Sequence, residues 1–205
     1  MYIKQAHASD FYVAYHLDSS LTLLHAQSLQ RYRLEPESAM APSLEHVLDL
    51  RIYRSKTDTL ALNSTKGNAQ RFISPLTGGY LKGSSFSADF VQGGSDWLHV
   101  DPATGTTYLD ARLHFREQST GDVFYIRFTG VMRLDASIEK VLQWSPEARS
   151  TRAAEHYSFV SPVIEVSAER HKWMEQTAFV GHGHYYVPGD GTQAVEFEIY
   201  RLVTG

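Results

Sequence analysis

Apolar and polar residues alternate with a period of two over residues 108–116. Alternate positions are apolar (Leu109, Ala111, Leu113 and Phe115), and those between them are polar (Tyr108, Asp110, Arg112, His114 and Arg116). Successive side chains of a strand point to opposite faces, so the pattern predicts a strand with one apolar and one polar face. Residues 123–129 alternate in the same way after a turn at 119–122, which predicts an antiparallel hairpin.

Short strands separated by turns are predicted for most of the chain after residue 42. Four further segments are predicted strands: residues 47–52, 157–164, 178–186 and 194–203. Glycine and proline mark turns or bulges: residues 77–79, 93–94, 101–102, 104–106 and 188–191. This organisation favours an antiparallel barrel or a sandwich. We prefer the barrel, because closure removes exposed strand edges and leaves room for a lined cavity.

Two short helices and an N-terminal arm complete the expected architecture. Residues 137–143 are the first predicted helix, and residues 168–176 are the second, with Ser167 as its N-cap. In the arm, Asp18-Ser19-Ser20 could cap a further helix that runs to Tyr32. We therefore expect an arm over residues 1–42 and a single mainly-β domain over residues 43–205, an ordinary size for one domain.

Composition and charge narrow the classes of function. Aromatic residues make up 12% of the chain, which favours a β-rich fold or an aromatic-lined cavity. The net charge is −4 and no basic stripe is present, so nucleic acid is not an expected partner. The chain has no cysteine, which excludes disulfides, thiolate metal sites, iron–sulfur clusters and a cysteine nucleophile.

Targeting signals are also lacking in the sequence. No apolar run approaches the ~18–20 residues that span a bilayer. The first seven residues, MYIKQAH, lack the apolar core of a signal peptide. We expect a cytoplasmic protein with no membrane partner.

The polar face of the predicted hairpin carries the first candidate chemistry. Asp110 and Arg112 share a face, and Tyr125 and Arg127 share a face on the partner strand, where they could lie opposite. If the apolar face packs outward, this cluster lines the barrel. Asp110 would then be a general base, Tyr125 a proton donor, and either arginine would hold a carboxylate, enolate or phenolate oxygen. The alternative is a structural ion pair between neighbouring strands.

Trp97 and two histidines are further candidates. Trp97 follows a Gly-Gly turn and offers a flat wall to an aromatic ligand, or it plugs one end of the barrel. Beside it, Asp96 is interpreted as a turn cap. His182 and His184 share a strand face and could chelate a metal, but no third ligand is fixed by the spacing. We prefer His182 as a single acid or base, with no metal.

Nucleotide and hydrolase motifs are absent from the sequence. It contains no G-x-S-x-G elbow, no P-loop and no G-x-G-x-x-G fingerprint. Chemistry that depends on a cofactor therefore has no support, and we expect none.

Four motifs in order resemble the domain-of-unknown-function-3237 family over about residues 43–203. They are PLTGGYLKG (75–83), GGSDW (93–97), LDAR (109–112), and Trp173 followed by FVGHG (179–183). The resemblance implies an antiparallel β-barrel of the calycin type, similar to lipocalins, with a pocket but no assigned reaction. The arm before Ser43 is longer than in the family, residues 63–70 are expanded, and His182 replaces a small polar residue. These departures suggest a specialised member.

Together these residues give a first assignment. Asp110, Arg112, Tyr125 and His182 are the catalytic candidates. The substrate-binding candidates are Trp97, Arg127, Tyr80, Trp173 and His184. The preferred function is a cofactor-independent isomerase, cyclase, dehydratase or pericyclic enzyme, in specialised metabolism by analogy, that acts on a small hydrophobic or aromatic molecule.

Two alternatives remain open. The first is a lipocalin-like carrier without turnover, because the same aromatic pocket would serve it. The second is an assembly protein, a homodimer in which the arm over residues 1–42 is exchanged between protomers. A carrier tolerates an apolar lumen, whereas an enzyme needs an ionisable side chain that points inward and has a perturbed pKa.

Overall fold

The computed structural model describes residues 41–63 and 69–204. This part contains ten strands: β1 (Ser43–Arg54), β2 (Leu60–Asn63), β3 (Gln70–Gly83), β4 (Ser87–Phe90), β5 (Ser95–Asp101), β6 (Thr106–Glu117), β7 (Val123–Arg133), β8 (Ser158–Val166), β9 (Phe179–Tyr186) and β10 (Ala194–Val203). The helical elements are α2 (Ala136–Leu142) and two 3₁₀ helices, η1 (Ala153–Glu155) and η2 (Glu169–Gln176). No helix within these ranges is long and apolar enough to cross a membrane. The helix predicted between residues 18 and 32 lies outside them.

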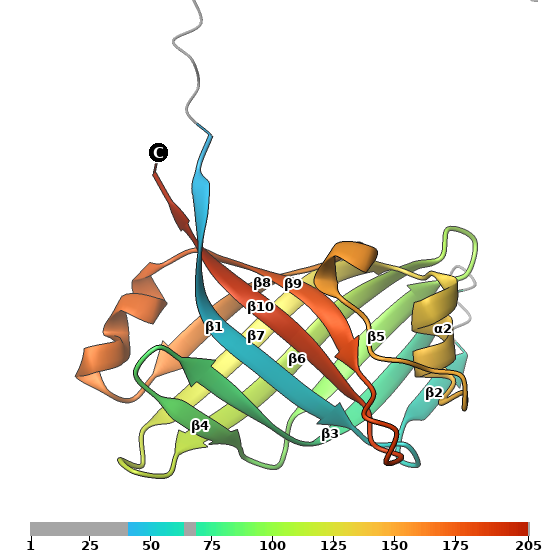
Figure 1. Ribbon diagram of the computed structural model, residues 1–205, viewed down its shortest axis with the longest axis horizontal. Coiled ribbons are helices and arrows are strands. Elements are labelled where there is room, and N and C mark those ends of the chain that lie inside the picture. Colours follow the sequence, from blue (N-terminus) through green and yellow to red (C-terminus); the bar gives the residue numbers. More distant parts are fainter. Residues whose placement is uncertain (1–40, 64–68, 205) are drawn as a thin grey trace, which may run out of the picture. The chain divides into compact units, whose positions relative to one another are not determined.

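The strands form one antiparallel sheet that closes on itself (Figure 1). Its order is β1-β10-β9-β8-β7-β6-β4-β3-β2, with β5 pairing with β3 and β6. β1 also pairs with β3, from Leu48 opposite Gly83 to Arg54 opposite Leu76, and this pairing closes the ring. The antiparallel β-barrel predicted from the sequence is therefore confirmed. Closure leaves β1 without a free edge along this length.

The barrel is irregular between β8 and β9. These strands pair at only two positions, Phe159 opposite His182 and Val160 opposite Gly181. η2 lies beside the rest of β8, where Lys172 Nζ donates to Val166 O at 2.6 Å and Glu175 Oε1 accepts from Val166 N at 2.9 Å. Side chains of η2 thus satisfy strand groups that no neighbouring strand reaches.

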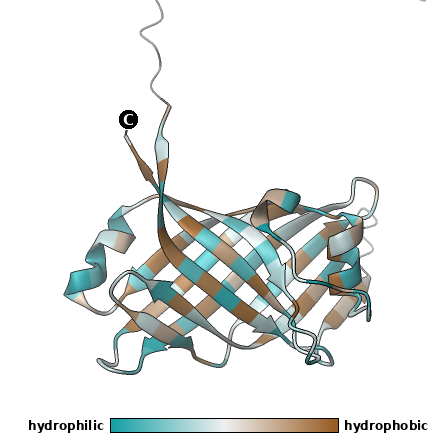
Figure 2. Ribbon diagram, viewed as in Figure 1, coloured by the Kyte–Doolittle hydropathy of each residue, from teal (hydrophilic) through white to brown (hydrophobic). Residues whose placement is uncertain are grey.

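The hairpin predicted from alternation is confirmed, and the apolar face of both its strands lies inside. β6 and β7 pair from Thr106 opposite Arg133 to Arg116 opposite Val123. The apolar positions of β6 are at most 6% exposed: Leu109, Ala111, Leu113 and Phe115. β9 and β10 also pair, across the turn predicted at residues 188–191. Figure 2 shows the resulting alternation of hydrophobic and hydrophilic residues along the strands.

Gly79 allows β3 to approach β1 closely. Its φ is +144°, and a Cβ at this position would lie 2.0 Å from Arg51 O. Any larger residue would push the two strands apart where the barrel closes. The segment 77–79, predicted as a turn or a bulge, is a bulge in β3, because the register with β1 shifts between Tyr53 and Arg54.

Both predicted helices exist, but the predicted cap of the second is wrong. The first is the α-helix α2, whose N-cap Asp135 accepts from the N–H groups of Ser137 and Ile138. The second, η2, is a 3₁₀ helix that has Ala168 at its N-cap without a side-chain hydrogen bond. Ser167 Oγ instead accepts from Val123 N at 2.8 Å, which ties β7 to the segment that follows β8.

Candidate functional site

The polar face of β6 and β7 lies on the outside of the barrel. These polar residues could line the lumen only if the apolar face of the two strands packed outward. The apolar face instead fills the core of the barrel. Asp110 and Arg112 form an ion pair at 3.3 Å without hydrogen-bond geometry, and each side chain is about 40% exposed. Arg112 lies opposite Arg127, whereas Tyr125 lies opposite His114, two positions away from the expected partner. An exposed pair of this kind contributes little energy.

The aromatic candidates Trp97 and Tyr80 also face outward. Arg112 lies over the Trp97 ring, with its Cζ 5.0 Å from the centroid. Tyr80 lies near Lys82 and Arg51, at 4.5 and 5.3 Å from its centroid. Trp173, on η2, is 36% exposed. The structure therefore brings Trp97 and Arg112 together but leaves Tyr80 and Trp173 elsewhere on the surface.

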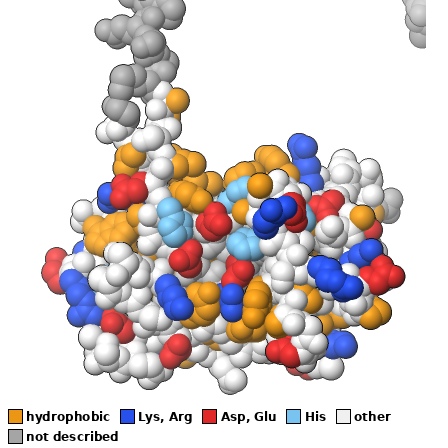
Figure 3. All heavy atoms as spheres, in the orientation of Figure 1, with side chains coloured by type: hydrophobic (Ala, Val, Ile, Leu, Met, Phe, Trp, Pro, Cys, Tyr) orange, Lys and Arg blue, Asp and Glu red, His pale blue; other side chains and the backbone are white. Residues whose placement is uncertain are grey.

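His182 and His184 share the outer face of β9 but have different partners. The His182 ring stacks on Phe159 at 4.4 Å. His184 Nε2 lies 3.0 Å from Glu196, which also pairs with Arg51. Figure 3 shows histidine and acidic side chains gathered on the face formed by β1, β9 and β10. Among the described residues, no group of three potential metal ligands includes either histidine.

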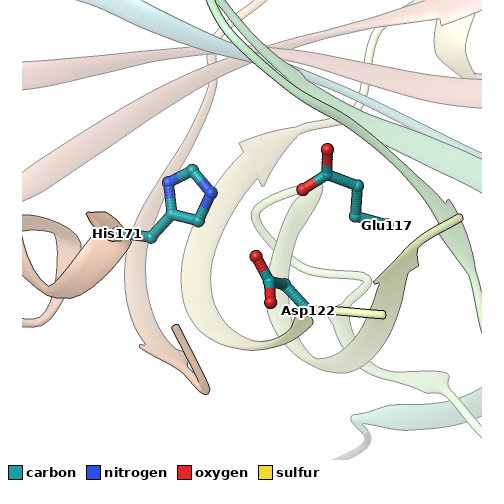
Figure 4. A group of neighbouring side chains, drawn as sticks. All are labelled: Glu117, Asp122 and His171. Carbon is teal, nitrogen blue, oxygen red and sulfur yellow. The ribbon is translucent and has the colours of Figure 1, made fainter. Parts of the chain in front are cut away.

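The described residues contain one group with the spacing of metal ligands, at the end of the barrel beside η2. It consists of Glu117, Asp122 and His171, whose side chains converge in Figure 4. Arg170 already occupies the place of a cation, because its Nη2 contacts Glu117 at 2.9 Å and also contacts Asp122. Its Nε donates to His171 Nε2 at 3.1 Å, so this nitrogen is an acceptor, and burial lowers the pKa of His171. The cluster is an ion-pair network centred on Arg170, although Asp122 Oδ2 makes no hydrogen bond to the described residues.

The opposite end of the barrel holds two adjoining cavities beneath α2. The outer cavity has a volume of about 290 Å³, at the low end for small-molecule sites, and Phe72, Thr107 and Trp144 contribute to its walls. The inner cavity of about 30 Å³ leads toward Asp96 and Tyr185, and has room for one water or a similar small group. Arg54 lines both cavities and connects them.

Three ionisable side chains face these cavities because each continues an inward-facing row. Arg54 follows Leu48, Leu50 and Ile52 on β1. Asp96 precedes Leu98 on β5, and Tyr185 follows Phe179 on β9. The same alternation that packs the core therefore ends, at this end of the barrel, in polar side chains.

Asp96 is the carboxyl group with the most perturbed chemistry. Burial raises its pKa to about 6, although the backbone N–H of Asp110 donates to its Oδ1 at 3.3 Å and Arg54 also favours the ionised form. Asp110 thus contacts this site only through its backbone. A carboxyl group with a pKa near 6 exchanges a proton readily close to neutral pH.

Arg54 and Tyr185 lack strong partners of their own. Arg54 Nη1 is enclosed and has no hydrogen-bond partner among the described residues, and burial lowers the pKa of its guanidinium. Burial also raises the pKa of Tyr185 to about 12, so its hydroxyl stays protonated. That hydroxyl contacts Met132 Sδ at 3.2 Å, and a thioether is a weak acceptor. Both groups keep donors available for a ligand.

Trp144 closes the outer cavity from the end of α2. Its N–H donates to Val141 O at 3.0 Å, and the N–H of Ser145 donates to Lys140 O at 2.9 Å, which is a Schellman ending. Trp144 occupies the left-handed position of this ending, with φ +55°, where glycine is usual. A non-glycine residue costs about 1–2 kcal/mol in this conformation. Such strain often marks functional sites.

The period of two along the strands could have indicated that Arg54 and Tyr185 face inward. Extending the period of Leu48, Leu50 and Ile52 by one step places Arg54 inside. On β9 the candidate residues His182 and His184 lie on the outer face, as Tyr186 does. Tyr185 lies on the inner face.

Comparisons with known proteins agree with the fold. A family model described as a protein of unknown function (DUF3237) matches residues 42–202. A protein of unknown function from Clostridium acetobutylicum is 21% identical with a TM-score of 0.63, over 80% of this chain and 98% of that one. One from Rhodopseudomonas palustris is 20% identical with a TM-score of 0.65, over 80% and 99%. A β-barrel-like protein from Acinetobacter baumannii is 22% identical with a TM-score of 0.59, over 80% and 97%. No curated protein matches the sequence.

Proposed function

The chain belongs to the DUF3237 family, and we propose that it is a cofactor-independent enzyme that moves a proton on a small, partly aromatic organic molecule held beneath α2. The observation that supports this most directly is Asp96, a carboxyl group with a pKa of about 6 that faces a cavity. An ionisable group in a cavity lined mainly by apolar side chains costs stability, so its presence there favours a chemical role. Phe72 and Trp144 supply aromatic walls for the substrate.

The proposed step is proton abstraction next to a carbonyl group. The Asp96 carboxylate takes a proton from the carbon beside the carbonyl, and the electron pair moves onto the carbonyl oxygen. The Tyr185 hydroxyl turns from Met132 and donates a hydrogen bond to that oxygen. Protonated Asp96 then returns the proton, either to another carbon, which isomerises the substrate, or to a leaving hydroxyl, which departs as water. The inner cavity has room for one such water.

A carrier without turnover is the second candidate, and the apolar walls of the outer cavity favour it. Leu98, Val100 and Leu142 line this space and would suit a hydrophobic ligand. A carrier has no use for a carboxyl group with a raised pKa at the inner end, and we therefore rank the enzyme first.

Proton abstraction can be tested before the natural substrate is known. In D₂O, the enzyme should incorporate deuterium next to the carbonyl of small aryl ketones and aryl keto acids, which mass spectrometry detects. We expect Asp96→Asn to lower this rate by about 10²–10⁴-fold. The wild-type rate should rise with pH with an apparent pKa of about 6, because the carboxylate is the base.

The matched control is Asp89→Asn, which removes an exposed carboxylate on β4 and should exchange at the wild-type rate. Equal exchange by wild type and Asp96→Asn would refute the proposed base. If only Asp110→Asn lost deuterium exchange, the general base would be Asp110 on the outer face of the barrel. If the wild-type protein bound one of these aryl ketones or keto acids without exchanging deuterium, the carrier function would be favoured.

A further inference from the structure

The charges around the outer cavity are all of one sign. Two more open hollows adjoin it through Lys56 and Trp144. The ionisable side chains other than tyrosine on the three surfaces are Arg54, Lys56 and Arg149. No Asp or Glu lines any of the three hollows, although the whole chain carries a net charge of −4. The entrance is therefore a local positive region on an acidic protein, and such a region attracts anions.

Arg54 forms no ion pair with a described carboxylate, although Asp96 favours its charged form from a longer distance. Its backbone N–H donates to Gln193 O at 3.1 Å, so the main chain is fixed, but Nη1 is enclosed and unpartnered among the described residues. Its guanidinium also lies 5.7 Å from the centre of the Trp144 ring. Leaving a buried cation unpaired is costly, and a bound anion would remove that cost.

Thr107 provides a second unsatisfied group in the same cavity. The residue is 0% exposed, and its Oγ1 has no hydrogen-bond partner in the part of the chain that the structure describes. Almost all buried hydroxyls in proteins are hydrogen-bonded, so this one indicates a partner that binds from the cavity. A guanidinium and a hydroxyl are donors that suit a carboxylate.

We propose that the outer cavity binds a small organic carboxylate, with its anionic group on Arg54 and Thr107 and its reactive carbon toward Asp96. This inference rests on the proposed function, because it places the substrate in the same cavity, and it adds the chemical class of that substrate. Lys56 and Arg149 draw the anion to the entrance, and Trp144 and Phe72 enclose its ring. The volume of about 290 Å³ limits the ligand to roughly one ring with short substituents.

The experiment compares benzoate with benzamide, its neutral counterpart of the same shape. Calorimetry and ligand-observed NMR on the full chain should give benzoate an affinity at least about tenfold above that of benzamide. Arg54→Met should remove this preference. Thr107→Val should reduce it severalfold, and Arg116→Met, which removes an exposed arginine from the outer face of β6, should keep it.

The outcomes separate this inference from the proposed reaction. Benzoate binding that survives in Asp96→Asn and is lost in Arg54→Met supports the anion site, whether or not deuterium exchange occurs. Equal affinity for benzoate and benzamide in wild type, or unchanged benzoate binding in Arg54→Met, overturns it. If benzoate binds through Arg54 and no carbonyl compound exchanges, the anion site stands and the proposed enzyme fails.

Discussion

The two ends of the barrel use the same kinds of side chain in opposite ways. At the η2 end, Arg170 contacts Glu117 and Asp122 and donates to His171, so each charge has a partner. At the α2 end, Arg54 and Asp96 line one cavity but form no ion pair, and Arg54 Nη1 has no partner among the described residues. Figure 1 shows α2 and η2 at opposite ends of the barrel.

The difference shows how to distinguish a structural cluster from a candidate site. Paired charges lower the energy of the folded chain, and hydrogen bonds from Ser119, Thr120 and Arg170 lower the pKa of Glu117 accordingly. Unpaired charges raise that energy, and burial raises the pKa of Asp96. A group that destabilises the free protein is retained where a ligand or a reaction uses it. The spacing of metal ligands alone would select the η2 end, where Arg170 already takes the position of a cation.

The largest expected effect concerns the pH dependence of stability in Asp96→Asn. The carboxyl titrates near 3.8 in the unfolded chain and near 6 in the folded protein. Between these values the folded state binds the proton more tightly, so Asp96 destabilises the fold increasingly as pH rises from 4 to 7. The variant lacks this group, and its free energy of unfolding relative to wild type should rise by about 2.4 kcal/mol over that range.

Urea unfolding at pH 4 and pH 7.5 measures this difference, and other titrating groups cancel between the two proteins. Asp89→Asn should stay within about 0.5 kcal/mol of wild type at both pH values, as exposed substitutions generally do. A constant difference between Asp96→Asn and wild type would mean that Asp96 is not buried in the way described.

The second prediction concerns Arg54 and Arg170, whose replacement should change the free energy of unfolding in opposite directions. Arg54→Met removes an unpaired buried cation among Phe72, Leu98 and Leu142, and should raise the free energy of unfolding by about 2 kcal/mol. Arg170→Met leaves Glu117 and Asp122 without their cation and should lower it. Denaturant unfolding of both variants is the measurement. Destabilisation by Arg54→Met would show that its guanidinium has a partner and would remove the contrast between the ends.

Most of the fold could be predicted from the sequence, because it depends on alternation. The period of two in β6 and β7 determined their pairing and the face that is buried. What alternation could not determine was how the sheet closes into a barrel. That depends on closure by β1 and β3, a contact between residues about 30 positions apart, and on the bulge at residues 77–79.

The candidate site was predicted less well, for a related reason. Asp110 and Arg112 are conspicuous because they are charged residues on one face of an alternating strand, but such a face points to solvent as often as it forms a site. Asp96 was interpreted as a turn cap, since its neighbours Gly93 and Gly94 are turn residues. Its burial comes from Arg54, Tyr185 and Leu142, on three distant segments, and no local pattern contains that information.

The third prediction tests what determines whether an aspartate stabilises or destabilises the fold: its hydrogen-bond and ion-pair partners, or its location at the α2 end. Asp135 lies at the α2 end like Asp96 but is fully used: Oδ1 accepts from the N–H groups of Ser137 and Ile138, and Oδ2 contacts His156 Nδ1 at 2.7 Å. Burial alone would raise the pKa of Asp135, but the bonds from Ile138 and His156 outweigh it and the pKa is lowered. Its contribution to stability is therefore present at neutral pH and is lost in acid.

Asp135→Ala should lower the free energy of unfolding at pH 7 by about 1 kcal/mol, the usual cost of a lost N-cap. Asp135→Asn keeps an acceptor for the cap and should cost less, which separates the cap from the contact with His156. Because the carboxylate is the stabilising form, the difference between wild type and Asp135→Ala should shrink below pH 4. That is the reverse of the trend expected for Asp96→Asn. If both aspartate variants shifted in the same direction with pH, the location at the α2 end, and not the presence of a partner, would determine the energy of these groups.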